Sequence, residues 1–336
     1  MGAIALSPTN IVNNQLTYDK DNTYISMSKY EESPEIMIKR GDVIFVKTGS
    51  TVGKVAYVDK MICKTTLNPQ VVVLKDIKCD NYILSVIMST RNFQNKIQRI
   101  TVGGAVPTLS QVAMGNIFIS LPAAKEQEKI SKFISLLDER ITTQNKIIDK
   151  LQSLIKGIRN DVFGKLRKDI GLNAKVGDVL SYEQPQPYIV EDTEYTAGGT
   201  PVLTANKAFV LGYTSETDGI YDKGDCIIFD DFTLDCKYVD FPFKVKSSAI
   251  KILTAKNKEL LRYTFEFLKY LDLSTDEHKR HYIAETQNQE FILPTTQIVR
   301  TIAHAFSTLS SRMQTIVKQR DMLELQKQYL LRQMFI

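Results

Sequence analysis

The sequence predicts an α+β protein: two mixed α/β segments with many short strands, separated by two long helices that form an antiparallel coiled coil. Three observations predict it. Residues 121–163 and 293–335 align without a gap at an offset of 172, with eleven identities. Both copies have helical periodicity, and a strand-rich and turn-rich stretch precedes each, which is typical of a duplication. The predicted boundaries are residues 1–120, 121–164, 165–292 and 293–336.

In each copy of the repeat, apolar residues recur in steps of three and four, as in a heptad seam. A helix of about 40 residues is about 60 Å long, so its apolar stripe needs a partner. The other copy in the same chain is the nearest partner, although a core helix of each domain or a homodimer seam would also use the stripe. The predicted seam residues are Ile130, Ile134, Leu137, Ile141, Ile148, Leu151, Ile155, Ile302, Phe306, Leu309, Met313, Ile316, Leu323 and Leu330.

The segments before the helices contain short apolar runs that end at turn residues, as strands do. The first segment is expected to have strands at 37–46, 52–58 and 71–74 and a helix at 81–97. The second is expected to have strands at 223–229 and 249–253 and a helix at 258–271.

Composition limits the class of protein. The chain is 43% hydrophobic, and it has neither a long uncharged apolar run nor the basic start of a signal peptide. Its four cysteines form no CxxC pair, which favours reduced thiols and a cytoplasmic location without membrane contact. The net charge is +5, but residues 169–293 hold 13 Lys and Arg against 21 Asp and Glu. Any nucleic-acid contact there requires a local basic patch.

Four motifs together resemble the specificity (S) subunit of type I restriction-modification systems. They are the Lys39 to Phe45 run, the Gly49 to Lys54 turn, the Gly103 to Ser110 stretch and the Leu121-Pro122 helix start with Glu126-Gln127 and Leu137-Asp138. The resemblance implies two target-recognition domains that read the halves of a bipartite target in double-stranded DNA. It also implies a chain without catalysis or a bound cofactor of its own. Methyltransferase subunits, which carry S-adenosylmethionine, would dock along the helices, and a restriction subunit would join through them.

The chain departs from this family in two places. Family members have a first strand and turn ahead of the stretch that matches residues 2–16, so the first recognition domain is expected to be shortened. The second half retains such a lead-in at residues 175–179. The second helix has Ile298-Val299 and Leu309-Ser310 in place of the Glu-Gln and Leu-Asp pairs.

Candidate DNA contacts are basic, hydroxyl, amide and glycine residues in turns, because such groups hold phosphates or reach base edges. The DNA target sequence does not follow from them. The candidates are Lys47, Ser50, Thr51, Lys54, Gln70, Arg99, Gly103, Gly104, Asn206, Lys207, Lys279 and Arg280.

Other functions have weaker support in the sequence. The Gly49 to Lys54 turn is one residue too short for a phosphate-binding loop, so no ATPase is predicted. Asp231, Asp235 and Lys237 follow the order of a metal-dependent nuclease site but lack a supporting distal carboxylate. His278 and His281 are expected on a basic surface rather than at a metal site. A protein-binding scaffold with a coiled-coil spacer is the main competing function.

Overall fold

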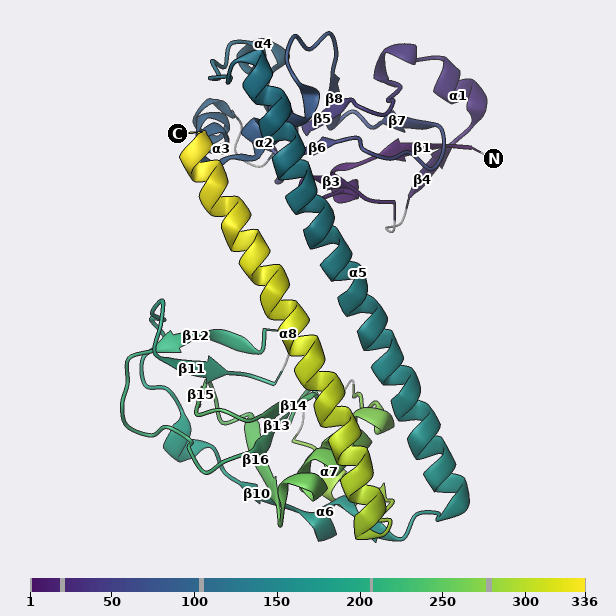
Figure 1. Cartoon of the computed structure of the whole chain (residues 1–336), viewed down its shortest axis with the longest axis vertical. Helices are drawn as coiled ribbons and strands as arrows, with labels where there is room; N and C mark the ends of the chain where they lie inside the picture. Colours follow the sequence, from purple (N-terminus) through teal and green to yellow (C-terminus); the bar gives the residue numbers. More distant parts are fainter. Residues whose placement is uncertain (1, 19–21, 103–105, 206–207, 276–279, 336) are drawn as a thin grey trace. The chain divides into compact units, whose positions relative to one another are not determined.

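The computed structural model describes residues 2–18, 22–102, 106–205, 208–275 and 280–335 (Figure 1). It divides into two compact units. Unit 1 comprises residues 1–144 and 319–336, and unit 2 comprises residues 145–318. Each unit therefore includes part of both long helices, α5 (Ala124–Asp169) and α8 (Thr296–Met334). No helix among the described residues is long and apolar enough to cross a membrane.

The main sheet of unit 1 has the strand order β2-β3-β6-β5-β8. Its central strand β5 is buried on both faces, so its side chains alternate between two cores. Ile44 and Val46 pack with Ile4 and Leu6, whereas Val43 and Phe45 face the helices. The strands are β2 (Ile11–Val12), β3 (Gln15–Leu16), β5 (Val43–Val46), β6 (Val55–Tyr57) and β8 (Val71–Leu74).

A smaller sheet of order β4-β1-β7 covers one face of the main sheet of unit 1, and short helices cover the other face. In the smaller sheet, β1 runs parallel to β7 and antiparallel to β4. Its strands are β1 (Ala3–Leu6), β4 (Thr23–Ile25) and β7 (Thr65–Leu67). The helices of unit 1 before α5 are α1 (Met27–Glu31), α2 (Asn81–Ser89), α3 (Arg91–Ile100) and α4 (Gln111–Gly115), with 3₁₀ turns η1 (Pro8–Asn10) and η2 (Pro34–Ile36).

The helix predicted over 81–97 is wrong in one respect, because the structure divides it at Thr90. Thr90 has an extended ψ of 151°, and its side-chain oxygen accepts a hydrogen bond from the N–H of Phe93. Thr90 thus ends α2 and caps α3, which is a usual role for threonine at a helix start.

Unit 2 repeats this plan. Its main sheet has the order β10-β16-β13-β14 and its smaller sheet the order β12-β11-β15. Ile227 and Phe229 of β13 face α7, and Cys226 and Ile228 face the smaller sheet. The elements are β9 (Ala174–Lys175), α6 (Val176–Val179), β10 (Leu180–Glu183), η3 (Gln186–Tyr188), β11 (Thr200–Leu203), β12 (Val210–Thr214), β13 (Cys226–Asp230), β14 (Cys236–Val239), β15 (Lys244–Val245), β16 (Ile250–Ala255), α7 (Lys258–Leu271), η4 (Thr286–Asn288) and β17 (Glu290–Phe291).

The duplication seen in the helices therefore extends to the sheets. The order β6-β5-β8 in unit 1 corresponds to β14-β13-β16 in unit 2, and all these neighbours are antiparallel. The parallel pair β1 and β7 corresponds to the parallel pair β11 and β15. A helix follows the last strand of the main sheet in both units, α2 in one and α7 in the other.

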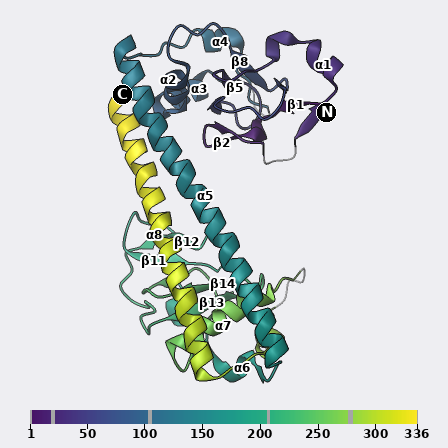
Figure 2. The same cartoon turned by 45° about the vertical axis from the view of Figure 1, so that its right-hand side comes forward.

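In each unit the two long helices run in opposite directions (Figure 2). In unit 1, Asp138 near the start of α5 forms an ion pair of 2.5 Å with Lys327 near the end of α8. In unit 2, the guanidinium of Arg159, near the end of α5, lies 5.8 Å from the ring centroid of Phe306, near the start of α8. The predicted α+β fold with antiparallel long helices is thus confirmed.

Candidate nucleic-acid interface

The turn between β5 and β6 carries several predicted DNA contacts. Two glycines with positive φ, Gly49 at 104° and Gly53 at 100°, allow the chain to reverse over a few residues. The N–H of Gly53 donates to the carbonyl of Val46 at 3.0 Å. At the tip, Ser50 is exposed and Thr51 half-buried. The fold therefore presents two hydroxyl groups at the tip of a tightly hydrogen-bonded turn.

Helix α3 holds this turn in place through the side chain of Gln94. The side-chain amide of Gln94 donates to the carbonyl of Gly53 at 2.8 Å and to that of Met88 at 2.6 Å. A Cβ atom on Gly53 would lie 2.5 Å from the Gln94 side-chain oxygen, so no larger residue fits without displacing Gln94. The position of the turn is thus fixed to the helices of unit 1.

Gln70 and residues 107–109 lie against the same turn. The N–H of Lys47 donates to the carbonyl of Gln70 at 2.9 Å, and that of Gly49 donates to Pro107 at the same distance. The Asn68 carboxamide oxygen accepts from the N–H of Gln70 at 3.0 Å. Lys47, Ser50, Thr51 and Gln70 are therefore brought into one cluster, which we call the β5–β6 cluster. Gly103 and Gly104 lie outside the described residues.

The remaining basic candidates of unit 1 are placed separately. The ammonium of the exposed Lys54 lies 3.4 Å from the carbonyl of Ile11, at the start of β2. Arg99 is exposed in the last turn of α3. Among the described residues, no hydrogen bond or ion pair joins either side chain to the β5–β6 cluster.

In unit 2, most of the predicted contacts fall where the structure is not described. Asn206, Lys207 and Lys279 lie outside the described residues, as does His278. Arg280 is exposed. The expectation for His281 is wrong, because this residue is only 1% exposed and its N–H donates to the carboxylate of Asp231 at 3.1 Å.

The residues of the alternative nuclease site are engaged in structural contacts. Asp231 is 1% exposed, and its carboxylate accepts from the N–H groups of His281 and Tyr282 and lies 3.5 Å from the Lys251 ammonium. Asp235 forms ion pairs with Lys269 at 3.1 Å and with Lys237 at 4.0 Å. Within the described ranges, no group of three or more His, Cys, Asp or Glu residues is arranged to hold a metal.

The Glu-Gln pair of the helix start has an internal role. The carboxylate of Glu126 accepts from the N–H of Ala123 at 3.0 Å, which caps the start of α5. The side chain of Gln127 is 9% exposed. Its oxygen accepts from the N–H of Asp80 at 2.9 Å, and its amide donates to the carbonyl of Pro122 at 2.8 Å. Gln127 therefore joins α5 to the start of α2.

A second polar contact joins α2 to both long helices in unit 1. The hydroxyl of Tyr82 donates to Asp138 at 2.6 Å, and Asp138 also pairs with Lys327 of α8. Burial, together with the neighbouring Asp138 carboxylate, raises the pKa of the Tyr82 phenol, so this hydroxyl remains a donor at physiological pH. The Leu-Asp motif predicted a helix start but not this contact, which depends on residues 56 and 189 positions away.

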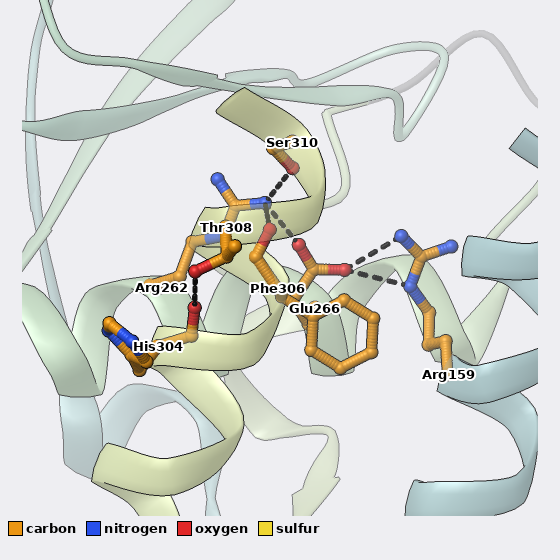
Figure 3. Close-up of polar contacts among 7 residues, drawn as sticks. All are labelled: Arg159, Arg262, Glu266, His304, Phe306, Thr308 and Ser310. Atoms are coloured by element: carbon orange, nitrogen blue, oxygen red, sulfur yellow. Dashed lines mark hydrogen bonds and ion pairs between the residues drawn. The ribbon is translucent and has the colours of Figure 1, made fainter. Parts of the chain in front are cut away.

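In unit 2, a larger polar network joins α7, the helix that corresponds to α2, to both long helices (Figure 3). Glu266 of α7 accepts two hydrogen bonds from Arg159 of α5, at 2.9 and 2.7 Å, and one from Arg262 at 2.7 Å. Arg262 also donates to the carbonyl of Phe306 at 3.3 Å and to the hydroxyl of Ser310, both on α8. The Glu266 side chain is 1% exposed. The sequence signal for this network was the spacing of four residues between Arg262 and Glu266 on one predicted helix.

The predicted seam residues all lie on the less exposed faces of α5 and α8. None of the fourteen is exposed, and five of them are buried. The buried ones are Ile134, Leu137, Ile148, Ile155 and Phe306. The end of α5 also enters the core of unit 2, where Phe163 lies 5.3 Å from the Tyr263 ring and 5.5 Å from the Phe267 ring.

Comparison with known proteins identifies relatives for part of the chain. It is 45% identical over 126 residues to the type I restriction enzyme EcoR124I/EcoR124II specificity subunit of Escherichia coli, covering 35% of this chain and 31% of that protein. It is 28% identical over 131 residues to the type I restriction enzyme MjaVIII specificity subunit of Methanocaldococcus jannaschii, covering 39% of this chain and 30% of that protein. The chain thus aligns with about a third of the length of these relatives.

The fold is similar to a solved structure over its whole length. The crystal structure of the type I restriction-modification S subunit from M. genitalium matches all of this chain and 92% of that one, with a TM-score of 0.65 and 15% identity. Residues 6–153, which include the β5–β6 cluster and about the first two thirds of α5, match the family described as type I restriction modification DNA specificity domain. Residues 6–153 therefore match the DNA specificity domain of type I restriction-modification systems.

Proposed function

We propose that this chain is a non-catalytic specificity subunit that reads a bipartite sequence in double-stranded DNA. The observation that carries the proposal is the duplicated fold, one copy of which matches a DNA specificity domain. Two copies of one reading fold suit a target with two half-sites. Residues 1–120 and 165–292 would be the recognition domains, and residues 121–164 and 293–336 the helices between them. Such a subunit would work in the cytoplasm.

The β5–β6 cluster suits the first half-site. Backbone N–H groups and hydroxyls of a tight turn bind phosphates, while an amide such as that of Gln70 makes paired hydrogen bonds to adenine in the major groove. Gln70 is exposed, and its backbone is held by Lys47 and Asn68, so its side chain starts from a fixed position. Lys54 and Arg99 would add phosphate contacts.

Catalysis would come from partners. Methyltransferase subunits that carry S-adenosylmethionine would dock along α5 and α8, and a restriction subunit would join the assembly through them. Unit 1 has an exposed apolar stripe on α8 that suits such a partner. Met322, Leu325 and Tyr329 follow one another in steps of three and four and are 69%, 65% and 63% exposed.

We expect DNA binding that weakens with salt and is strengthened by a methyltransferase subunit. If about four phosphates are neutralised, affinity should fall roughly 100-fold between about 50 and 200 mM salt. Electrophoretic mobility shift on duplex DNA with and without the methyltransferase measures this. Absence of binding at every salt concentration under both conditions would favour the scaffold function instead.

Gln70→Ala is expected to relax sequence preference in one half-site only, by about 1 to 3 kcal/mol at one base pair. Mapping methylated bases in DNA from cells that carry the chain and its methyltransferase gives both the target and the change. Gln328→Ala, an exposed glutamine on α8, is the matched control and should leave the target unchanged. An unchanged target in Gln70→Ala would remove Gln70 from the interface.

Leu325→Ser and Tyr329→Ser are each expected to weaken methyltransferase binding about tenfold, because both would lose a buried apolar contact. Isothermal titration measures the affinity without DNA. Glu324→Ser changes an exposed residue on another face of the same helix and should bind normally. Equal affinity for all three variants would place the docking surface elsewhere.

A further inference from the structure

The turn between β13 and β14 in unit 2 corresponds to the turn between β5 and β6 in unit 1. In unit 1, the N–H of Lys47 donates to the carbonyl of Gln70 at 2.9 Å. In unit 2, the N–H of Asp231 donates to the carbonyl of Ala249 at the same distance. Each bond lies just beyond the last paired residues of the two central strands of its sheet. Asp231 therefore stands at the position of Lys47, and Ala249 at that of Gln70.

The chain that leads toward each long helix contacts its turn in the same way. The N–H of Leu109 donates to the carbonyl of Lys47 at 2.8 Å, and the N–H of His281 donates to the carbonyl of Asp231 at 3.0 Å. These two donors are 172 residues apart, which is the offset of the repeated helices. The duplication thus extends backward to this stretch. Arg280, which precedes His281, takes the place of the threonine that precedes Leu109.

The segment before β16 corresponds to the segment that carries Gln70. In unit 1, the N–H of Asn68 donates to the carbonyl of the last residue of β1 at 2.9 Å. In unit 2, the N–H of Lys246 donates to the carbonyl of the last residue of β11 at 3.1 Å. Lys246, which was not among the sequence candidates, therefore stands at the position of Asn68 and lies in the segment that reaches the β13–β14 turn.

The exposed charges around the β13–β14 turn are positive, although unit 2 contains the acidic segment of the chain. The carboxylates of the turn are occupied: Asp230 and Asp231 are 6% and 1% exposed, and Asp235 pairs with two lysines. Lys246 and Arg280 are both exposed. The turn thus has the local basic patch that a nucleic-acid contact in this segment requires.

We propose that Lys246 and Arg280 carry the DNA contact of unit 2, and that Arg280 reads a guanine in the second half-site. This assignment rests on the proposed function. Ala249 has no hydrogen-bonding side chain, so the adenine contact suggested for Gln70 is not repeated in unit 2. The planar guanidinium of an arginine instead makes paired hydrogen bonds to O6 and N7 of guanine. Lys246 holds a neighbouring phosphate as a point charge.

Arg280→Ala should relax recognition of one G·C pair, in the half-site that Gln70→Ala does not affect. Mapping methylated bases in DNA from cells that carry the chain and its methyltransferase locates this pair. Competition mobility shift with duplexes altered at that pair should show discrimination about 10- to 100-fold weaker than that of the unmodified chain. Arg280→Lys keeps the charge but loses the fork, so it should also relax the guanine preference.

Lys246→Ala should weaken binding to all sequences alike and lower the salt slope by about one, because one phosphate contact is lost. Mobility shift at several salt concentrations measures this. Lys256→Ala is the matched control, since Lys256 is an exposed lysine at the opposite end of β16. It should change neither the target nor the slope. Hydrogen exchange of β13 should be unchanged in all these variants, because the altered side chains are exposed.

Two results would overturn the assignment while the proposed function stands. In both, the unmodified chain still directs methylation to a bipartite sequence. In the first, Arg280→Ala and Lys246→Ala leave the target and the salt slope unchanged. In the second, Arg280→Ala alters the same half-site as Gln70→Ala. Absence of any sequence-specific methylation with the unmodified chain would instead overturn both the assignment and the proposed function.

Discussion

Replacing Glu266 by alanine is expected to lower the free energy of unfolding of unit 2 by about 3 to 5 kcal/mol. Glu266 pairs with both Arg159 and Arg262, whose side chains are 14% and 9% exposed. Its removal leaves two guanidinium groups facing each other with little solvent. The guanidinium of Arg262 also lies 4.9 Å from the Tyr238 ring centroid, so its displacement would disturb aromatic packing.

Hydrogen exchange of β13 and β16 in denaturant reports unfolding of unit 2 alone, which avoids assuming a single transition for the whole chain. Glu259→Ala is the matched control on the same helix. Glu259 pairs with Arg300 at 3.7 Å, and both side chains are well exposed, so this pair should contribute about 0 to 1 kcal/mol. Glu266→Gln keeps an acceptor for the arginines and should fall between the two. Equal losses for Glu266→Ala and Glu259→Ala would mean that the network contributes nothing beyond a surface ion pair.

The local sequence pattern predicted the helices and strands whose formation depends mainly on residues close to them in the chain. Helix α7 has the predicted bounds of 258–271, and strand β8 those of 71–74. The strand predicted over 37–46 begins only at Val43, because Gly41 has a φ of 91° and the Asp42 carboxylate accepts from the N–H of Lys39. Such a side-chain turn competes with the strand and does not alter the apolar pattern.

Contacts between distant residues did not follow from the pattern. The parallel pairing of β1 with β7 joins residues about 60 positions apart, and short apolar runs do not specify their partners. In the candidate site, the Gly49 to Lys54 turn was identifiable from its glycines. That Gln70 lies against it depends on the pairing of β5 with β8, and that Gln127 is internal depends on the N–H of Asp80.

The burial of His281 also did not follow from the residues next to it in the sequence. A histidine next to Lys279 and Arg280 reads as part of a basic surface, yet His281 is buried because its backbone binds Asp231. Asp231 in turn lies beside Lys251, which is 1% exposed and donates to the side chain of Gln184 at 2.8 Å. The buried carboxylate of Asp231, in the turn after β13, and the buried ammonium of Lys251 on β16 stabilise each other. They lie far apart in the sequence, so the residues next to either one do not predict its role.

Asp231→Ala should therefore destabilise unit 2 by about 3 to 5 kcal/mol, since it leaves the Lys251 ammonium buried without its carboxylate and two backbone N–H groups without their acceptor. Asp235→Ala is the control, because the Asp235 side chain is 32% exposed and should cost about 1 kcal/mol or less. Hydrogen exchange of unit 2 measures both changes. A metal-dependent nuclease would behave differently. The unmodified chain would cleave duplex DNA, both variants would lose this cleavage, and Asp231→Ala would remain stably folded. If Asp231 is structural, Asp235→Ala should retain salt-sensitive DNA binding, and the unmodified chain should show no such cleavage with added Mg²⁺.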